Sequence, residues 1–511
     1  MLSNLSSMDT TIRINNLQVT YASADKPALQ IEDLTIPAGQ CVVLCGPSGS
    51  GKSSLLKLLN GLIPEYYPAQ VTGQVFLGQL DLRQASVEDL SYHVASVFQN
   101  PATQFFHTQV LHELVFPCEN QGLSSEQIAG RLEEVNHLFQ LESFYDKPIF
   151  QLSGGQKQLI ALATASMQGS PILLLDEPTA NLDQEAVHKV QEVLHKLKKE
   201  GKTIIIAEHL LAYLTDLADR YLYFQEGQLV ADYPASDFLH RTEECRQDMG
   251  LRCYDAEPYR RAIAEQASQF VSDQEGLSIG NLSVSQAGQL LYKIEQLCLK
   301  PGQVVGLVGP NGSGKTSLAR YLVGLEVDKA SQITWQGKAL SPRQRLEKTS
   351  FVMQDVHLQL FAETVRRELT LGQKDMTIDA DLVSRFRLED LLDRHPVSLS
   401  GGEQQRLMIV ASLLADKDIL IFDEPSSGLD LAQMKELAKA LAFLKKEKKL
   451  VLLISHDEEL LATVCDKIVD IKQLKWDYEQ SKERNIKDCP TSHGRKYSSN
   501  ADWDGRFLSS R

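Results

Sequence analysis

The sequence has no long hydrophobic run, no leader-like N-terminus and no cysteine pair spaced for a metal. No apolar run among its 511 residues approaches the length of about 18 residues that a membrane-spanning helix needs. Residues 1–10 are polar and lack the apolar core of a signal peptide. The eight cysteines are scattered without a C-x-x-C pair, which indicates reduced thiols and disfavours a zinc site. We therefore expect a cytosolic protein that does not itself cross a bilayer.

Positive charge is also in short supply. Asp and Glu number 67 against 52 Lys and Arg, so the formal net charge is −15. Such acidity disfavours nonspecific binding to nucleic acid, although a local basic patch is compatible with it.

Two stretches of the sequence fit the phosphate-loop pattern G-x-x-x-x-G-K-[ST]. They are Gly46-Pro47-Ser48-Gly49-Ser50-Gly51-Lys52-Ser53 and Gly309-Pro310-Asn311-Gly312-Ser313-Gly314-Lys315-Thr316. Each follows a short apolar run and opens a helix-like segment, as the pattern requires, so its backbone N–H groups can close around a phosphate. We expect Lys52 and Lys315 to reach the β- and γ-phosphates of a nucleotide. Ser53 and Thr316 are expected to ligand Mg²⁺.

The chain repeats itself beyond the two phosphate loops. A Ser-Gly-Gly motif begins at Ser153 and at Ser400, with an Asp-Glu pair 23 residues later and a histidine 56 residues later in both halves. From the phosphate-loop lysine to this motif the first half has 101 residues and the second has 85. Gln99 and Gln354 lie between, and the difference in length is divided between their two sides. The pattern predicts a duplicated domain with insertion-tolerant surface segments around a functional glutamine.

A pair of carboxylates ends an apolar run in each half, Asp176-Glu177 in the first and Asp423-Glu424 in the second. A carboxylate at a strand end can hold Mg²⁺, and its neighbour can polarise the attacking water. An Asp-Glu-Pro sequence alone is often only a turn, but here it accompanies a phosphate loop twice. We expect the aspartates at the metal and the glutamates as catalytic bases.

The Ser-Gly-Gly motifs, Ser153-Gly154-Gly155 and Ser400-Gly401-Gly402, each open a helix-like segment. A serine and two glycines at a helix start offer a hydroxyl, free N–H groups and a positive dipole end to an anion. An ordinary N-cap would use the same serine. The recurrence of the motif at one distance from both Asp-Glu pairs favours contact with the nucleotide.

Strand-like and helix-like segments alternate through both halves. Apolar runs at 172–175, 203–207, 419–422 and 450–454 suit strands that are buried on both faces of a parallel sheet. We expect an α/β fold with two tandem P-loop NTPase domains. The expected boundaries are a flexible N-terminus at 1–11, a first domain at 12–244, a linker at 245–276, a second domain at 277–474 and a disordered tail at 475–511.

With this motif set the chain resembles the ATP-binding cassette (ABC) ATPases over about residues 12–240 and 277–470. The resemblance implies that each cassette has a mostly parallel core sheet, an antiparallel β subdomain and a helical subdomain. It also implies that the two cassettes pair head to tail, so that no second ATPase chain is required. Each ATP would then lie between the phosphate loop of one cassette and the Ser-Gly-Gly motif of the other, with Ser400 facing Lys52 and Ser153 facing Lys315.

The resemblance assigns roles to further residues. Gln99 and Gln354 resemble the glutamine that contacts Mg²⁺ and signals to a membrane partner. His209 and His456 resemble the switch histidine at the γ-phosphate, although a histidine after a strand is more often structural.

Two further matches concern the pairing of the cassettes and their chemistry. Asn181-Leu182-Asp183 and Gly428-Leu429-Asp430, which we name the crossing loops, resemble the loops that cross between cassettes. Glu177 and Glu424 stand where the family has its catalytic glutamate, so both sites are expected to hydrolyse ATP with Mg²⁺.

One departure concerns the base of the nucleotide. Tyr21 stands where the family stacks an aromatic ring on adenine, whereas Gln286 occupies that place in the second half. Tyr292 is nearby in sequence, but no pattern places it at the base. We expect the second site to lack an aromatic platform.

The segments that contain and follow the two glutamines resemble those of energy-coupling-factor (ECF) transporter ATPases. They are residues 98–105 and 113–116 in the first half, and 353–355, 359–361 and 363–365 in the second. The resemblance implies an importer of a vitamin, a precursor or a metal ion, with an integral membrane coupling subunit and a separate substrate-binding subunit. The chain would then be peripheral at the cytoplasmic face of the cell membrane. Residues 100–113 and 355–368 are expected to form the surface that docks the membrane subunits, with Phe105, Phe106, Leu360 and Phe361 exposed on it. The alternative is that any one of these large apolar residues belongs to the core.

Two other functions share a pair of cassettes. A tandem sugar-importer ATPase is disfavoured by the two intact catalytic sets and by the ECF-like segments. A soluble tandem ABC protein acting on the ribosome would need a long charged helical linker and a basic face for RNA. Here the linker is short and mixed and the chain is acidic, so we expect no nucleic-acid partner.

Overall fold

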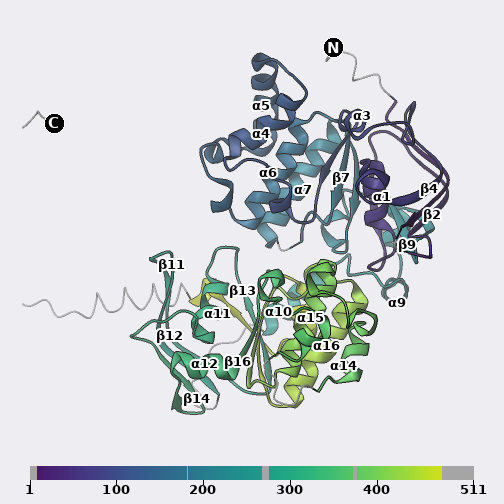
Figure 1. The fold of residues 1–511 in the computed structure, drawn as a ribbon. Coiled ribbons are helices and arrows are strands. Elements are labelled where there is room, and N and C mark those ends of the chain that lie inside the picture. The colour runs from purple at the N-terminus through teal and green to yellow at the C-terminus, as the bar shows by residue number, and fades with distance from the viewer. Residues whose placement is uncertain (1–8, 23, 181, 267–275, 372–376, 475–511) are drawn as a thin grey trace, which may run out of the picture.

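The computed structural model describes residues 9–22, 24–180, 182–266, 276–371 and 377–474. Residues 1–8 of the expected flexible N-terminus and the whole expected tail lie outside the described residues. Figure 1 shows two α/β halves, one above the other in this view, joined by a segment that contains short helices.

The core of the first half is a parallel sheet of apolar strands. Its order is β9-β3-β8-β7-β6, and every neighbouring pair is parallel. Every residue of β3 and β8 is buried, as expected for strands covered on both faces. The bounds are β3 Cys41–Cys45, β6 Val94–Val97, β7 Ile172–Asp176, β8 Thr203–Ala207 and β9 Arg220–Gln225.

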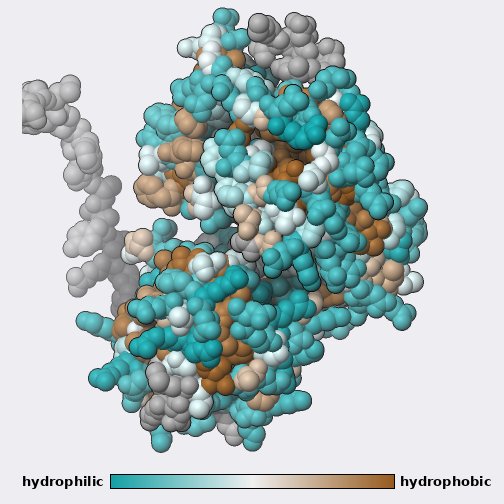
Figure 2. Space-filling view, turned by 45° about the vertical axis from the view of Figure 1, so that its right-hand side comes forward, coloured by the Kyte–Doolittle hydropathy of each residue, from teal (hydrophilic) through white to brown (hydrophobic). Residues whose placement is uncertain are grey.

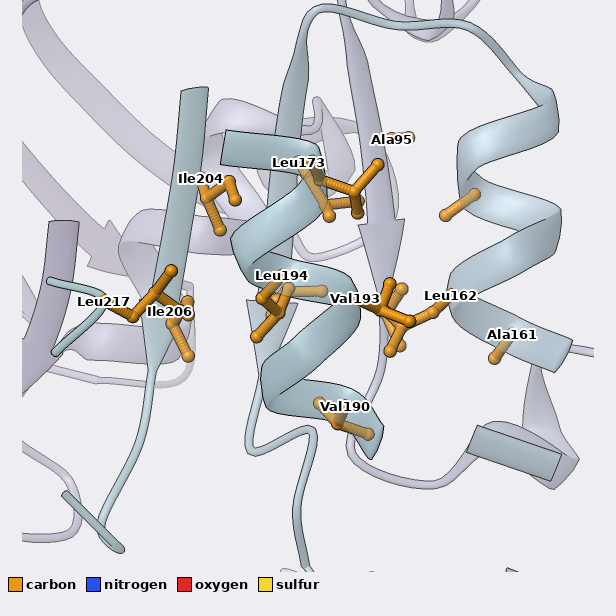
Figure 3. Packing of buried hydrophobic residues seen from close by; sticks show 14 of the residues in the cluster. Ala95, Ala161, Leu162, Leu173, Val190, Val193, Leu194, Ile204, Ile206 and Leu217 are labelled. Carbon is orange, nitrogen blue, oxygen red and sulfur yellow. The ribbon is translucent and has the colours of Figure 1, made fainter. Parts of the chain in front are cut away.

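Three long helices flank this sheet and begin at the expected motifs: α1 (Lys52–Leu59), α6 (Gly154–Met167) and α7 (Gln184–Lys199). Figure 3 shows how α7 packs, with Val193 facing Leu162 of α6 and with Leu194 near the sheet residues Ile204 and Ile206. The strands share one hydrophobic core with α6 and α7 and a second one with α1, and this packing fixes the carboxyl ends of the strands relative to the helix starts.

An antiparallel region continues the same sheet. Strands β1 (Ile12–Tyr21), β2 (Leu29–Ile36), β4 (Ala69–Leu77), β5 (Leu80–Asp81) and β10 (Gln228–Pro234) extend it to ten strands. The junction is a single parallel pair between Gln228 of β10 and Gln30 of β2. The expected core sheet and antiparallel subdomain are therefore one continuous sheet in this half.

A helical region stands beside the first core. Helices α4 (Val110–Asn120) and α5 (Ser125–Phe139) pack on α6 and on each other. The remaining elements are α2 Leu62–Glu65, α3 Val87–Ser91, α8 Ala235–Leu239 and the 3-10 turns Pro101–Thr103, Glu142–Phe144, Ile149–Gln151 and Ala212–Leu214.

The second half repeats the plan with two separate sheets. Its parallel sheet has the order β16-β17-β18-β13-β19, which matches that of the first core strand for strand. The bounds are β13 Gln303–Val308, β16 Thr349–Val352, β17 Ile419–Asp423, β18 Leu450–Ile454 and β19 Lys467–Asp470. The antiparallel sheet is β12-β11-β14-β15, with β11 Leu277–Gln286, β12 Gln289–Leu299, β14 Gln332–Trp335 and β15 Lys338–Ala339.

The helices of the second half include α11 (Lys315–Val323), α15 (Gly401–Leu414) and α16 (Leu431–Lys446), the counterparts of α1, α6 and α7. Its helical region is smaller, because α13 and α14 have five and six residues. The other elements are α12 Pro342–Lys348, α13 Val365–Leu369, α14 Ala380–Arg385, α17 Glu458–Val464 and the 3-10 turns Val356–Gln359, Glu389–Leu391 and Pro396–Ser398.

The segment expected as a linker is partly helical. Helix α9 (Glu243–Asp248) ends near the first phosphate loop, and α10 (Glu257–Gln266) packs against α17 of the second half. In Figure 1 the helical region of each half lies on the side where the other half has its antiparallel sheet. The two halves are thus related head to tail. No helix among the described residues is long and apolar enough to cross a membrane.

Candidate nucleotide-binding sites

Both phosphate loops have a backbone that only glycine accommodates at its tightest points. Gly46 has φ +141°, and a Cβ on it would lie 2.0 Å from the carbonyl oxygen of Phe224. Gly51, with φ +102°, forms the start of α1 in the left-handed region. In the second loop Gly309 has φ +149°. The glycines of each loop therefore let backbone N–H groups approach a phosphate, as the motif predicts.

The lysine of each loop folds over the loop itself. Lys52 Nζ donates to the carbonyl oxygens of Gly46 at 2.8 Å and Pro47 at 2.9 Å. Lys315 Nζ likewise donates to Gly309 at 2.7 Å and to Pro310 at 3.1 Å. Both ammonium groups are held above the cradle in which the β- and γ-phosphates are expected.

A hydroxyl and a carboxylate meet beside each phosphate loop. Ser53 Oγ donates to Asp176 Oδ1 at 3.1 Å, and Thr316 Oγ1 donates to Asp423 Oδ2 at 2.6 Å. Burial raises the pKa of both aspartates by more than the hydroxyl hydrogen bond and the nearby lysine lower it, so a cation would stabilise each carboxylate. Oxygen ligands of this kind suit Mg²⁺. The residues present thus fit a Mg²⁺-bound nucleotide in both halves.

In the first site, which we define by the phosphate loop of Lys52, Glu177 lies between a glutamine and a histidine. Gln99 Nε2 donates to Glu177 Oε2 at 2.7 Å, and His209 Nε2 lies 3.6 Å from Glu177 Oε1. Burial raises the pKa of Glu177 to about 8, and the nearby Glu208 and Asp176 contribute. Burial also lowers the pKa of His209 well below its usual value, so its imidazole is neutral.

In the second site, defined by the phosphate loop of Lys315, the corresponding glutamate and histidine are also in contact. Glu424 Oε2 accepts from the backbone N–H of His456 at 3.2 Å, and the two side chains approach to 3.5 Å. Burial raises the pKa of Glu424 to about 8, and burial together with Lys315 lowers the pKa of His456 to about 4. Gln354, the counterpart of Gln99, is exposed.

The first site contains a buried carboxylate that the sequence motifs do not predict. Glu208, which precedes the switch histidine, accepts from Thr179 Oγ1 at 2.9 Å and from Tyr213 Oη at 3.1 Å. It also accepts from the backbone N–H groups of the two residues that follow it, at 2.8 and 3.1 Å. The counterpart in the second half is Ser455. Aligning the two halves in the register of the repeat reveals this Glu-to-Ser difference, but Glu208 belongs to none of the sequence motifs.

The crossing loops join each half to the opposite phosphate loop. Asp183 Oδ2 accepts from the backbone N–H of Asn311 at 2.6 Å, and Asp430 Oδ2 accepts from that of Ser48 at 2.9 Å. Gly428 lies against the first site, since a Cβ on it would come within 3.1 Å of Gln99 Nε2. Asn181, at the corresponding place in the first loop, lies outside the described residues.

The Ser-Gly-Gly motifs act as helix caps in this structure. Ser153 Oγ accepts from the backbone N–H of Gln156 at 3.3 Å, and Ser400 forms a capping box with Glu403. Gly155 abuts α7, because a Cβ on it would lie 2.6 Å from the Cβ of Ala186. Since α7 begins at the crossing loop, the first motif is held near the second phosphate loop. Contact of either motif with a nucleotide remains a prediction.

The aromatic residue expected at adenine is found at the first site. Tyr21 ends β1, is partly exposed, and its hydroxyl lies 3.0 Å from Ser54 Oγ on α1. Tyr292 is only 1% exposed and donates to the carbonyl of Gly314 at 3.1 Å, so it is a core residue. Gln286 is exposed at the end of β11, where the chain turns at once into β12.

A cavity of about 670 Å³ lies between the two halves. Its walls include the glutamate and the histidine of both sites: Glu177, His209, Glu424 and His456. The two reaction centres therefore border one common interior space.

Two surface loops follow the two glutamines and have the same internal structure. Buried Glu113 accepts from the backbone N–H of Phe106 at 2.9 Å, and buried Glu368 accepts from that of Phe361 at 2.9 Å. The two phenyl rings are 78% and 80% exposed. Figure 2 shows brown, hydrophobic areas on both halves of one mostly hydrophilic face of the molecule.

The residues that precede these two rings in sequence were expected to be exposed, but they are not. Phe105 and Leu360 are partly buried and pack against the two cores instead of standing at the surface. The two glutamates cause this alternation, because each binds consecutive backbone N–H groups and so fixes which side chain turns outward.

Two head-to-tail P-loop domains, each with a phosphate loop, a carboxylate pair and a loop that contacts its partner, define a tandem nucleotide-hydrolysing protein. A family model described as ABC transporter matches residues 29–180 and 292–427. The chain belongs to this family, whose ATPase domains bind ATP, generally with Mg²⁺, and hydrolyse it.

Individual proteins resemble this chain over most of its length. A Treponema denticola protein named "Putative ABC transporter ATP-binding protein" is 39% identical over 469 residues, covering 90% of this chain and 94% of that protein. The Bacillus subtilis protein named "Putative HMP/thiamine import ATP-binding protein YkoD" is 29% identical over 494 residues, covering 91% and 90%. A solved structure named RNase-L Inhibitor has a TM-score of 0.61 at 24% identity, covering 89% of this chain and 87% of that one, which shows a shared fold.

Proposed function

We propose that this chain is the ATP-hydrolysing subunit of a membrane importer of the ECF type, which takes up a vitamin, a precursor or a metal ion. The observation that carries the proposal is the pair of exposed rings, Phe106 and Phe361, in loops of the same construction. A solvated aromatic ring that the backbone holds outward in both halves suits a protein partner. The import function in the printed name of the Bacillus relative supports the same class of activity.

The proposed chemistry uses the same groups in both sites. Glu177 and Glu424 hold the attacking water and take its proton, and the raised pKa of each suits a base that works near neutral pH. His209 and His456 are neutral and accept or donate one hydrogen bond beside the γ-phosphate. Lys52 and Lys315 turn from their own loop carbonyls to the phosphate oxygens. Mg²⁺, when bound, neutralises charge on the transferred phosphoryl group.

The proposed coupling route is short. Gln99 touches Glu177, and the loop that begins after it carries Phe106 seven residues further on. A change at the γ-phosphate that moves Gln99 therefore reaches the proposed docking loop without crossing the core. Membrane subunits bound at both loops would be moved when the two cassettes close and reopen.

Affinity purification of the full chain from its native membranes tests the proposal. An importer subunit should bring two kinds of hydrophobic membrane protein with it, one for coupling and one for substrate. Recovery of ribosomes would instead favour the soluble tandem ABC alternative. Recovery of a sugar permease with its own binding protein would favour the sugar-importer alternative.

A further inference from the structure

Arg252 is the largest fully buried side chain of the described residues and lies between the two halves, just after α9. Its Nε donates to Glu459 Oε2 at 2.7 Å and its Nη2 to Asp457 Oδ1 at 2.5 Å. Its Nη1 lies 3.4 Å from the carbonyl oxygen of Leu429. One guanidinium from the connecting segment thus contacts two separate loops of the second cassette.

Both of those loops belong to a reaction centre. Asp457 directly follows the switch histidine His456 and also caps α17 through the backbone N–H of Leu460 at 3.1 Å. Leu429 belongs to the crossing loop whose Asp430 binds the first phosphate loop at Ser48. Through one side chain, the connecting segment contacts the residue that follows the histidine of the second site and the crossing loop that lies against the first site.

The arrangement exists on one side only. In the register of the repeat, the positions of Asp457 and Glu459 are occupied in the first cassette by Leu210 and Ala212. A second arginine supports the same cluster, since Arg246 Nη1 lies 3.4 Å from Glu459 Oε1. The first cassette has no acidic pair there to receive an arginine.

We propose that Arg252 is a positioning residue for ATP hydrolysis, which holds the switch loop of the second site and the crossing loop of the first site in register. The inference rests on the hydrolysis part of the proposed function and not on the identity of the membrane partner. Arginine is suited to this task because its planar fork can serve three acceptors in fixed directions, which the single ammonium of lysine cannot.

The charges of the cluster make the contact costly to break. Burial raises the pKa of Asp457, but the adjacent Arg252 outweighs it and holds the pKa below the usual value. A buried carboxylate that loses its cation must gain a proton or move toward water. Either response shifts the residue next to His456, and a small misplacement at a reaction centre is enough to slow the chemistry.

The test measures steady-state hydrolysis in two parent variants, each with one active site. Glu177→Gln leaves the second site active and Glu424→Gln leaves the first. Arg252→Gln should lower kcat about tenfold or more in both parents while KM for ATP changes little, because the phosphate loops are untouched. Arg252→Lys should restore only part of the lost kcat.

Arg260→Gln is the matched control. Arg260 of α10 pairs at 2.8 Å with Glu458 of α17, but the Arg260 side chain is 53% exposed, so this substitution should leave kcat nearly unchanged. Asp457→Asn should reproduce the loss, and its combination with Arg252→Gln should cost no more than the larger single change. In Asp457→Asn the guanidinium of Arg252 still pairs with Glu459. This variant can therefore test the proposal even if Arg252→Gln does not fold.

A normal kcat in folded Arg252→Gln or Asp457→Asn protein would overturn the proposal, and so would a rise in KM without a change in kcat. Lower thermal stability with normal kcat would assign Arg252 a structural role only. These outcomes are independent of co-purification, which tests the importer. The two proposals can therefore fail separately.

Discussion

Asp183 connects the start of its own helix α7 to the opposite half of the molecule, with one carboxylate oxygen for each. Oδ2 accepts from the backbone N–H of Asn311 in the opposite phosphate loop at 2.6 Å, and Oδ1 accepts from Ala186 at 2.8 Å. Asp430 repeats the arrangement with Ser48 at 2.9 Å and Gln433 at 2.8 Å. The start of one helix is thereby fixed to the phosphate loop of the other cassette, so neither site is complete within one half.

This contact predicts that each site depends on the aspartate of the other cassette. Asp430→Ala should lower hydrolysis at the first site, and Asp183→Ala should lower it at the second, each by roughly tenfold, since a hydrogen bond to a charged acceptor is lost. Assays in the Glu424→Gln and Glu177→Gln parents separate the sites. Asparagine at the same positions keeps the helix cap and controls for the loss of that cap. Equal losses at both sites from one substitution would contradict the trans assignment.

Glu177 and Glu424 are expected to be the catalytic bases of the two sites. Glu177→Gln and Glu424→Gln should each lower turnover while ATP binding persists, and the double variant should lose about 100-fold or more, in the range of general-base catalysis. The measurements are steady-state hydrolysis and equilibrium binding of ATP. Unchanged turnover in the Glu424→Gln variant would show that the second site does not contribute.

The raised pKa of these glutamates also predicts how stability depends on pH. Each pKa is about 8 in the folded, nucleotide-free protein against the ordinary glutamic acid value of 4.5, so the folded state holds the proton more tightly than the unfolded state. Stability from these groups is therefore present below pH 4.5 and is lost as the pH rises toward 8. Because glutamine cannot ionise, a Glu→Gln substitution removes this loss of stability at high pH.

Glu177→Gln should accordingly raise the melting temperature of the nucleotide-free protein by a few degrees near pH 8 and change it little near pH 5. Thermal melts over this pH range provide the measurement, and the exposed Glu133→Gln variant is the control. A gain in melting temperature that is larger at pH 5 than at pH 8 would contradict the prediction.

Sequence patterns predicted the parts of this molecule whose signal is local. The expected strands at 203–207 and 450–454 coincide with β8 and β18, because continuous apolar runs suffice to mark strands buried on both faces. Both phosphate loops are formed as expected, because their glycines are required by backbone geometry within a few residues. Such features depend little on the rest of the chain.

Features that depend on distant packing were out of reach. Arg252 and Asp457 are 205 residues apart in sequence, and no spacing rule connects them. Glu208 was missed because its hydrogen-bond donors come from Thr179 and Tyr213 as well as from its own loop. Phe105 is partly buried and Phe106 is exposed because buried Glu113 fixes the loop, although the two side chains are equally hydrophobic.

The exposed rings predict a partner interface. Phe106→Ala and Phe361→Ala should weaken recovery of the membrane subunits, most strongly together, because a buried aromatic ring is a frequent source of interface affinity. ATP binding should persist, since neither ring touches a phosphate loop. Phe443→Ala removes a ring on α16 that is 54% exposed and controls for the loss of any surface aromatic. Full recovery of the complex in the Phe106 and Phe361 double variant would remove these loops from the interface.

The two ATP sites should differ in how they hold the base. Stacking on an aromatic ring contributes on the order of 0.5–1.5 kcal/mol beyond its area, so the site with Tyr21 should bind ATP several-fold more tightly than the site with Gln286. Affinities in versions disabled at Lys52 or at Lys315 measure each site alone. Tyr21→Ala should weaken the first site, and Gln286→Tyr should tighten the second.

Tyr21→Phe separates the ring from its hydroxyl. This variant loses the contact with Ser54 at 3.0 Å but keeps the stacking face, so it should bind ATP nearly as well as the parent if stacking dominates. A loss as large as that of Tyr21→Ala would mean that the hydroxyl acts by fixing α1, and hence the phosphate loop, with the ring only a strand residue. Equal affinities of the two sites, insensitive to Gln286→Tyr as well, would show that the triphosphate contacts common to both loops set the affinity by themselves.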